Sequence, residues 1–250
     1  MMARRGVIGL LTGAATAMLT GCGMIGGESY RFRMTVEVET PEGLRTGSSV
    51  YEVTAQNHVK LLPDMRGRSR DVRGEAVAVD LPGGRTMFAL LKTLNRSGDD
   101  NLAYLSMATM DPAYKNDWVE SAARISSGDG IRSPAEVAPS RKYDDYENGQ
   151  PVRTEVPNYA MLVTFTDIAD PSSVKLVDPA DLAASFGPGV KLKRITVEIT
   201  DDPVTNGIEK RLGWLPSHYN KLLGGERFEK ISTRLADHLG AGNFSTELSE

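Results

Sequence analysis

A regular alternation of apolar and polar residues near the start of the chain constrains the fold more than any other feature. The apolar positions are Tyr30, Phe32, Met34, Val36 and Val38, and each is followed by an arginine, threonine or glutamate. Successive side chains of a strand point to opposite faces, so this period of two predicts a strand with one buried face. The turn letters TPEG come next, and residues 50–55 predict the returning strand of a hairpin.

The rest of the chain mixes strand and helix patterns. Alternation predicts strands at 75–81, 159–166 and 190–200, whereas 86–94 suits either a strand or a helix. Helical spacing of apolar residues predicts a helix after Asp111, a short one within 180–187, and an amphipathic helix at 227–239. The chain begins with predicted hairpins, and helices are interspersed among the later strands. This order predicts the α+β class, with a largely antiparallel sheet built from N-terminal hairpins and amphipathic helices packed on it.

A long polar segment at 126–158 is rich in Gly, Pro, Ser and Tyr, and we expect a loop there. Part of it, Asp144 to Glu155, matches several positions of a calcium-binding EF-hand loop. Tyr146 stands where that loop needs an oxygen ligand, and an acidic Asn-Gly turn explains the same letters. We therefore expect no metal site in this segment.

The first residues have the build of a secretory signal. The chain opens MMARR and then carries no charge from Gly6 to Gly21. A membrane-spanning helix needs about 20 predominantly apolar residues, and this run is shorter and interrupted by glycine and threonine. Cys22, the only cysteine of the 250 residues, follows directly. An internal disulfide is thereby excluded.

The sequence Leu19-Thr20-Gly21-Cys22 resembles the lipobox of bacterial lipoprotein precursors. The resemblance covers residues 1–22. It implies cleavage between Gly21 and Cys22, a diacylglyceryl thioether on the Cys22 thiol, and a further acyl chain such as palmitate on the new amino group. It divides the chain into a signal peptide (1–21), an acylated cysteine with a flexible tether (22–29) and a globular body (30–250). Gly23 then implies the periplasmic face of the outer membrane.

The charge of the chain is −4, and an acidic body argues against nucleic-acid binding, which depends on neutralising phosphates. We expect the protein to bind the membrane through the acyl chains on Cys22. An envelope protein is a further candidate partner.

No catalytic or cofactor motif is present, and the three histidines lack the spacing of metal ligands. The sequence therefore identifies no catalytic residue, and we expect no cofactor and no metal. Two segments are candidates for a partner surface, with solvated loop and ordinary packing as the alternatives. Their residues are Arg66, Arg68, Arg70, Arg73, Trp214 and Tyr219.

These observations favour a lipid-anchored envelope protein of binding or structural type. The alternative is an anchored hydrolase of envelope polymers that uses an Asp/Glu acid–base pair, because two carboxylates in a cleft leave little trace in a sequence.

Overall fold

The structure, a computed structural model, describes residues 24–58, 67–94, 102–115, 117–147, 150–228 and 231–248. The signal segment 1–21, the lipid site Cys22 and the candidate surface residue Arg66 lie outside the described residues. So do Asn148 and Gly149 of the acidic Asn-Gly turn.

Strands dominate the described part of the chain. They are β1 (Met24–Thr40), β2 (Gly43–His58), β3 (Arg68–Arg73), β4 (Val77–Leu81), β5 (Arg85–Thr93), β6 (Ala135–Glu136), β7 (Ser140–Glu147), β8 (Gln150–Pro157), β9 (Ala160–Phe165), β10 (Val174–Leu176) and β11 (Lys191–Ile199). The α-helices are α1 (Leu102–Met110), α2 (Trp118–Ser127) and α3 (Leu182–Phe186). Short 3₁₀ helices are η1 (Pro82–Gly84), η2 (Pro171–Ser173), η3 (Ile208–Lys210), η4 (Pro216–His218), η5 (Leu235–Asp237) and η6 (Ala241–Asn243).

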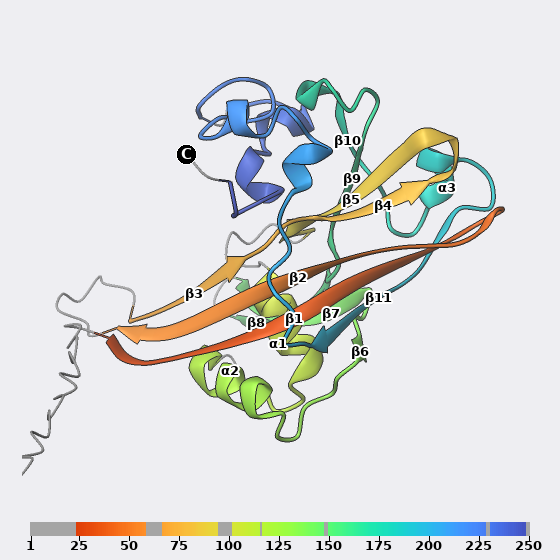
Figure 1. Cartoon of the computed structure of the whole chain (residues 1–250). Coiled ribbons are helices and arrows are strands. Elements are labelled where there is room, and N and C mark those ends of the chain that lie inside the picture. Colours follow the sequence, from red (N-terminus) through yellow and green to blue (C-terminus); the bar gives the residue numbers. More distant parts are fainter. Residues whose placement is uncertain are drawn as a thin grey trace, which may run out of the picture.

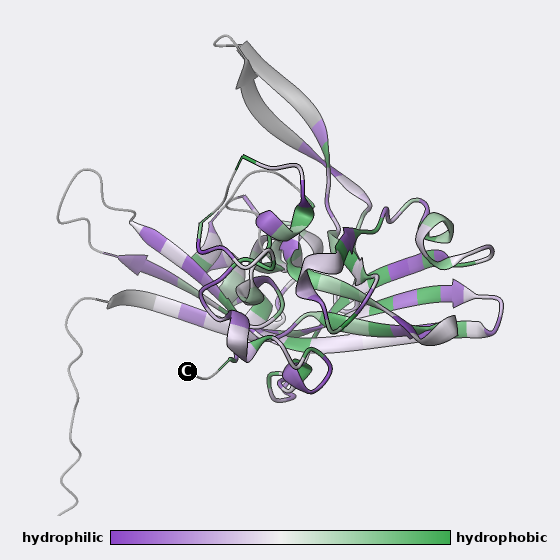
Figure 2. Cartoon of the chain, turned by 90° about the horizontal axis from the view of Figure 1, so that it is seen from above, coloured by the Kyte–Doolittle hydropathy of each residue, from purple (hydrophilic) through white to green (hydrophobic). Residues whose placement is uncertain are grey.

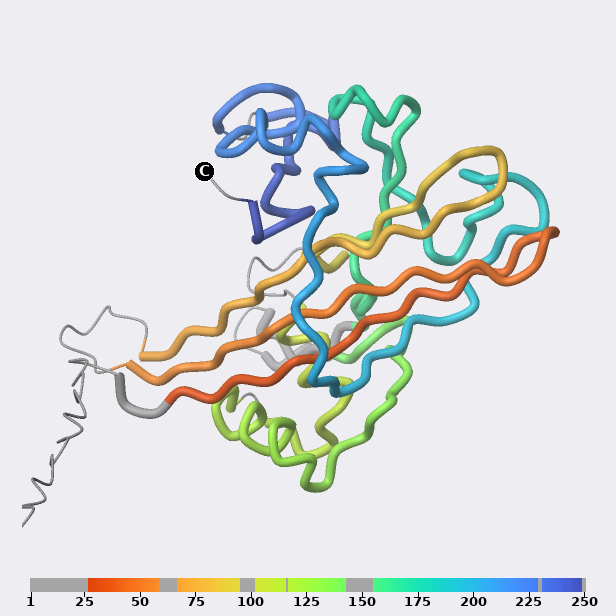
Figure 3. Tube along the Cα trace, in the orientation of Figure 1, coloured from red at the N-terminus to blue at the C-terminus, as the bar shows by residue number. Residues whose placement is uncertain are grey.

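The strands form a five-stranded sheet in the order β3-β2-β1-β11-β6, a four-stranded sheet in the order β10-β9-β5-β4, and the separate hairpin β7-β8. Every pairing between these strands is antiparallel, which confirms the predicted α+β class with a largely antiparallel sheet. The first hairpin contains the two longest strands among the described residues, and β1 and β2 stay paired from Thr40 opposite Gly43 to Met24 opposite His58. Figures 1 and 3 show these two strands side by side along their length.

The predicted alternation places one face of β1 in the core. Tyr30, Phe32 and the alternate apolar residues after them are buried, and the polar residues between them are more exposed. Figure 2 shows the same alternation of hydropathy along the strands. Phe32 stacks on Tyr51 of β2 with ring centroids 5.1 Å apart. Gly47 allows β2 to approach β4, because a Cβ there would clash with the carbonyl oxygen of Ala78.

The helix predicted after Asp111 is present, but it begins later, at Trp118. Asp117 caps it by accepting a hydrogen bond from the Glu120 amide (3.0 Å), and Gly128 ends it in the left-handed conformation. Ala122 and Ile125 point into the core, as their spacing predicts. The preceding helix, α1, ends at Met110 and was not predicted from the sequence.

The prediction of an amphipathic helix at 227–239 is wrong. In the described part of that range only η5 is helical, and Phe228 and Ile231 are exposed. The Ser232 hydroxyl accepts a hydrogen bond from the Arg234 amide and donates one to Asp237. Such local side-chain bonds stabilise turns in competition with a helix.

Three segments expected to be irregular contain strands. Residues 24–29, expected to be a tether, belong to β1 and pair with β2. The arginine segment, for which a solvated loop was the alternative, forms β3 at the edge of the larger sheet. The expected loop at 126–158 contains β6, β7 and β8, so the EF-hand-like letters fall in a hairpin instead of a helix–loop–helix. Backbone pairing between strands explains all three, because it does not require an apolar side chain at each position.

Candidate interaction surface

Two of the predicted arginines lie next to each other on β3. Arg68 is opposite Asn57 of β2, and Arg70 is opposite Ala55. Residues two apart in a strand share a face, and Ala55 belongs to the buried face of β2. Both arginines therefore lie on the side of the sheet that α1 and α2 cover (Figure 1).

Aromatic side chains from both helices meet these arginines. The Cζ atoms of Arg68 and Arg70 lie 4.8 and 4.3 Å from the ring centroid of Trp118, the first residue of α2. Arg70 is also 5.8 Å from the ring of Tyr104 in α1, and Arg141 of β7 is 4.3 Å from that ring. We call Arg68, Arg70, Arg141, Tyr104 and Trp118 the basic–aromatic cluster. Each of the five makes at least one further interaction within the chain.

The chemistry of the cluster is that of stacked guanidinium groups. A guanidinium over an aromatic face is held by the ring quadrupole, typically with about 0.5–1 kcal/mol at an exposed site. Its planar N–H fork matches the oxygens of phosphate or carboxylate groups. An arrangement of this kind suits an anionic partner better than an apolar one.

Buried polar contacts fix the two helices that carry the aromatic residues. The hydroxyl groups of Tyr30 in β1 and Ser106 in α1 form a buried hydrogen bond of 2.7 Å. Asp111, directly after α1, is almost fully buried and accepts hydrogen bonds from Arg124 (2.6 and 3.2 Å) and Ser121 (2.7 Å) of α2. Burial alone would raise the pKa of Asp111, but these hydrogen bonds outweigh it and hold the pKa below its usual value.

Asp111→Asn should lower the free energy of unfolding by about 2 kcal/mol at pH 7, because it removes the charge that Arg124 faces; the partial exposure of Arg124 limits the loss. The folded-state pKa of Asp111 is depressed, so its stabilisation is present above the unfolded pKa and is lost as the pH falls through the folded one. Chemical denaturation between pH 7 and 2 should show the two proteins converging in acid.

The matched control is Glu120→Gln, which removes the exposed carboxylate that also pairs with Arg124. We expect a change within about 0.5 kcal/mol for this surface pair. Equal losses for both variants at pH 7 would contradict the role assigned to Asp111.

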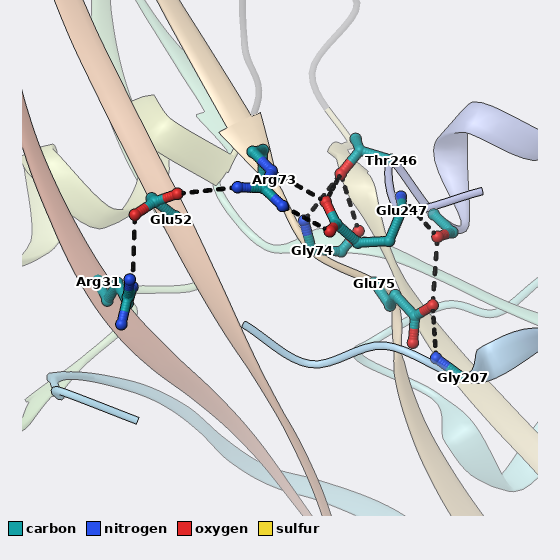
Figure 4. A network of polar contacts seen from close by, with 9 residues as sticks. Arg31, Glu52, Arg73, Gly74, Glu75, Gly207, Thr246 and Glu247 are labelled. Atoms are coloured by element: carbon teal, nitrogen blue, oxygen red, sulfur yellow. Dashed lines mark hydrogen bonds and ion pairs between the residues drawn. The ribbon is translucent and has the colours of Figure 1, made fainter. Parts of the chain in front are cut away.

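The remaining predicted arginine of this segment, Arg73, is not part of the cluster. It is an odd number of residues from Arg70, so it points to the other face of β3. There it pairs with Glu52 (3.2 Å) and binds both carboxylate oxygens of Glu247 (2.8 and 3.2 Å), and Glu52 continues to Arg31 (Figure 4). Arg73 thus ties the C-terminal residues to the larger sheet.

Beside this network, Glu75 is buried two residues before β4 begins (Figure 4). Its carboxylate accepts hydrogen bonds from the amides of Gly207 and Ile208 (2.9 Å each) and from the Ser245 hydroxyl (3.2 Å). Burial raises the pKa of Glu75, and these three donors partly offset the effect. Its contacts are those of a residue that holds the C-terminal segment in place.

Trp214 and Tyr219 do not join the arginines. Trp214 is 9% exposed, donates its indole N–H to the Ile168 carbonyl (3.0 Å), and packs against Phe165 and Phe244 at 5.7 Å each. Trp214 therefore has the contacts that the packing alternative describes. Tyr219 is 41% exposed and borders an open hollow of about 380 Å³.

The hydrolase alternative needs two carboxylates in one cleft. Glu209 and Glu247 border an open hollow of about 300 Å³, but both oxygens of Glu247 are bound by Arg73.

No group of three or more metal-ligating side chains occurs within the described ranges. Among those same residues, no helix has the length and apolar character needed to cross a bilayer.

The sequence pointed to Arg68 and Arg70 but missed Tyr104, Trp118 and Arg141. Trp118 was expected only as part of the apolar stripe of a helix, and Arg141 lay in the expected loop. The cluster draws on four elements far apart in the chain, and no local pattern connects them. Comparisons with protein-family models, curated proteins and solved structures found no match to this chain.

Proposed function

We propose that this chain is a lipid-anchored protein of the cell envelope, of binding or structural type, held at the membrane by acyl chains on Cys22. The observation that carries the proposal is Leu19-Thr20-Gly21-Cys22, where the only cysteine follows an uncharged run at the position that receives lipid in lipoprotein precursors. The proposed location is the periplasmic face of the outer membrane, and the proposed partners are its lipids and an envelope protein.

The start of β1 makes this anchor a short one. Met24 already pairs with His58, so only Gly23 separates Cys22 from the hairpin. Acyl chains on Cys22 would therefore hold the open end of the β1–β2 hairpin close to the bilayer. Two or more chains give stable attachment, since each buried methylene contributes about 0.8 kcal/mol.

Replacing Cys22 with serine tests the proposal. We expect the variant to remain an uncut precursor without acyl mass, because a hydroxyl cannot replace the thiol that accepts the diacylglyceryl group. The wild-type protein should be processed and pellet with membranes even in high salt. Fractionation and intact-mass measurement provide the readout.

Gly23→Ser is the matched control, because it changes the neighbouring residue and leaves the thiol in place. It should be processed and acylated like the wild type. A Cys22→Ser protein that is cut and membrane-bound as efficiently as this control would refute the proposal.

A further inference from the structure

The basic–aromatic cluster lies at the end of the sheet where the anchor would be. In the register of the larger sheet, Ile25 is opposite Asn57, and Asn57 is opposite Arg68. Neighbouring strands are about 4.8 Å apart, so the Arg68 backbone is about 10 Å across the sheet from Ile25. Figure 1 shows β3 beginning at the same end of the molecule as β1. Arg68 is thus level with a residue only three positions after Cys22.

The side chains at this end have the chemistry of a bilayer interface. Arginine forks bind phosphate oxygens, and basic residues close to a membrane are attracted to anionic lipids. Tryptophan concentrates at the level of the headgroups, where its ring meets both apolar and polar surroundings. Arg68 and Arg70 stack on Trp118, so the three groups would reach the headgroup layer together.

The charge of this end differs from that of the whole chain. The net charge of the chain is −4, but the row formed by Ile25, Asn57 and Arg68 contains no acidic residue. The next row on that face pairs Ala55 with Glu28 on one side and Arg70 on the other. On this face the two rows carry Arg68, Arg70 and Glu28, so they contain one more basic than acidic side chain, although the chain as a whole is acidic.

We propose that the basic–aromatic cluster docks on the bilayer that carries the acyl chains, with Arg68 and Arg70 binding lipid phosphates and Trp118 entering the headgroup layer. This inference rests on the proposed anchor at Cys22. The acyl chains alone attach the protein at one point, and docking of the cluster adds a second contact that fixes the orientation of the body on the membrane. The open end of the β1–β2 hairpin faces the membrane, and the turn between Thr40 and Gly43 points away from it.

The two tryptophans of the chain provide the test, since Trp118 is in the cluster and Trp214 packs on Phe165 of the smaller sheet. Lipidated protein is reconstituted into vesicles of phosphatidylethanolamine and phosphatidylglycerol that contain a headgroup nitroxide lipid. We expect the nitroxide to quench the wild type at least twofold more than Trp118→Phe, which retains only Trp214. This comparison leaves the buried Trp214 unchanged.

A second pair of variants separates the arginines from general surface charge. Arg68→Gln combined with Arg70→Gln should lose at least half of the Trp118 quenching. Arg45→Gln is the matched control, because Arg45 lies near the turn of the same hairpin and pairs there with Glu42; it should quench like the wild type. Vesicles of phosphatidylcholine alone should give the wild type less quenching than the anionic vesicles.

Flotation of the vesicles distinguishes the two ways in which the inference can fail. Protein that floats with vesicles while Trp118 is quenched no more than Trp214 would overturn the docking and leave the anchor intact. Wild-type protein that does not float would overturn the anchor and the docking together. Quenching that the double arginine variant retains in full would also overturn the assigned role of the arginines.

Discussion

Replacing Glu75 with alanine should lower the free energy of unfolding by about 3 kcal/mol. Glu75 is 2% exposed, and its carboxylate accepts hydrogen bonds from the amides of Gly207 and Ile208 and from the Ser245 hydroxyl. Alanine would leave these buried donors without an acceptor. The loss can be measured by denaturant unfolding at pH 7.

Glu39→Ala is the control for this change, because Glu39 is an exposed glutamate of β1. Its substitution should alter the free energy of unfolding by less than about 0.5 kcal/mol. If Glu75→Ala were no more destabilising than Glu39→Ala, Glu75 would not hold the C-terminal segment on the sheet.

The second large effect is expected for Phe244→Ala, with a loss of about 3–5 kcal/mol in the free energy of unfolding. Phe244 is fully buried among three aromatic rings, with centroids at 6.1 Å (Phe88), 5.8 Å (Phe165) and 5.7 Å (Trp214). Removing its ring leaves a cavity where the last residues of the chain meet the smaller sheet. Thermal and denaturant unfolding should both report the loss.

Phe228→Ala is the matched control, since the same side chain is 81% exposed there. We expect almost no change in the free energy of unfolding. A loss close to that of Phe244→Ala would mean that Phe228 packs against the body, as the helix predicted at 227–239 would require.

The sequence predicted the first hairpin and the α+β class because local alternation reports directly on burial in a strand. Tyr30 and Phe32 illustrate this, as both are buried where the period of two places them. The same reasoning failed for Phe228 and Ile231, whose helical spacing corresponds to no packed face. Spacing alone does not show whether a neighbouring element exists to cover an apolar stripe.

The candidate surface was only partly predictable, for a related reason. Arg68 and Arg70 stand out as charges in the sequence, but their contacts with Trp118 depend on the pairing of β3 with β2 and on the position of α2. Arg73 belongs to the same run of arginines but lies three residues after Arg70, and an odd separation along a strand places it on the other face, where it binds Glu247. The alternation itself is local, but which distant elements meet each face of β3 is a long-range property.

The intact mass of the wild-type protein purified from membranes tests the anchor most directly. The proposed function predicts a chain that begins at Cys22 and carries the additional mass of a diacylglyceryl group, with or without a third acyl chain. A membrane-derived protein that retains residues 1–21, or one that begins at Cys22 without any acyl mass, would contradict it.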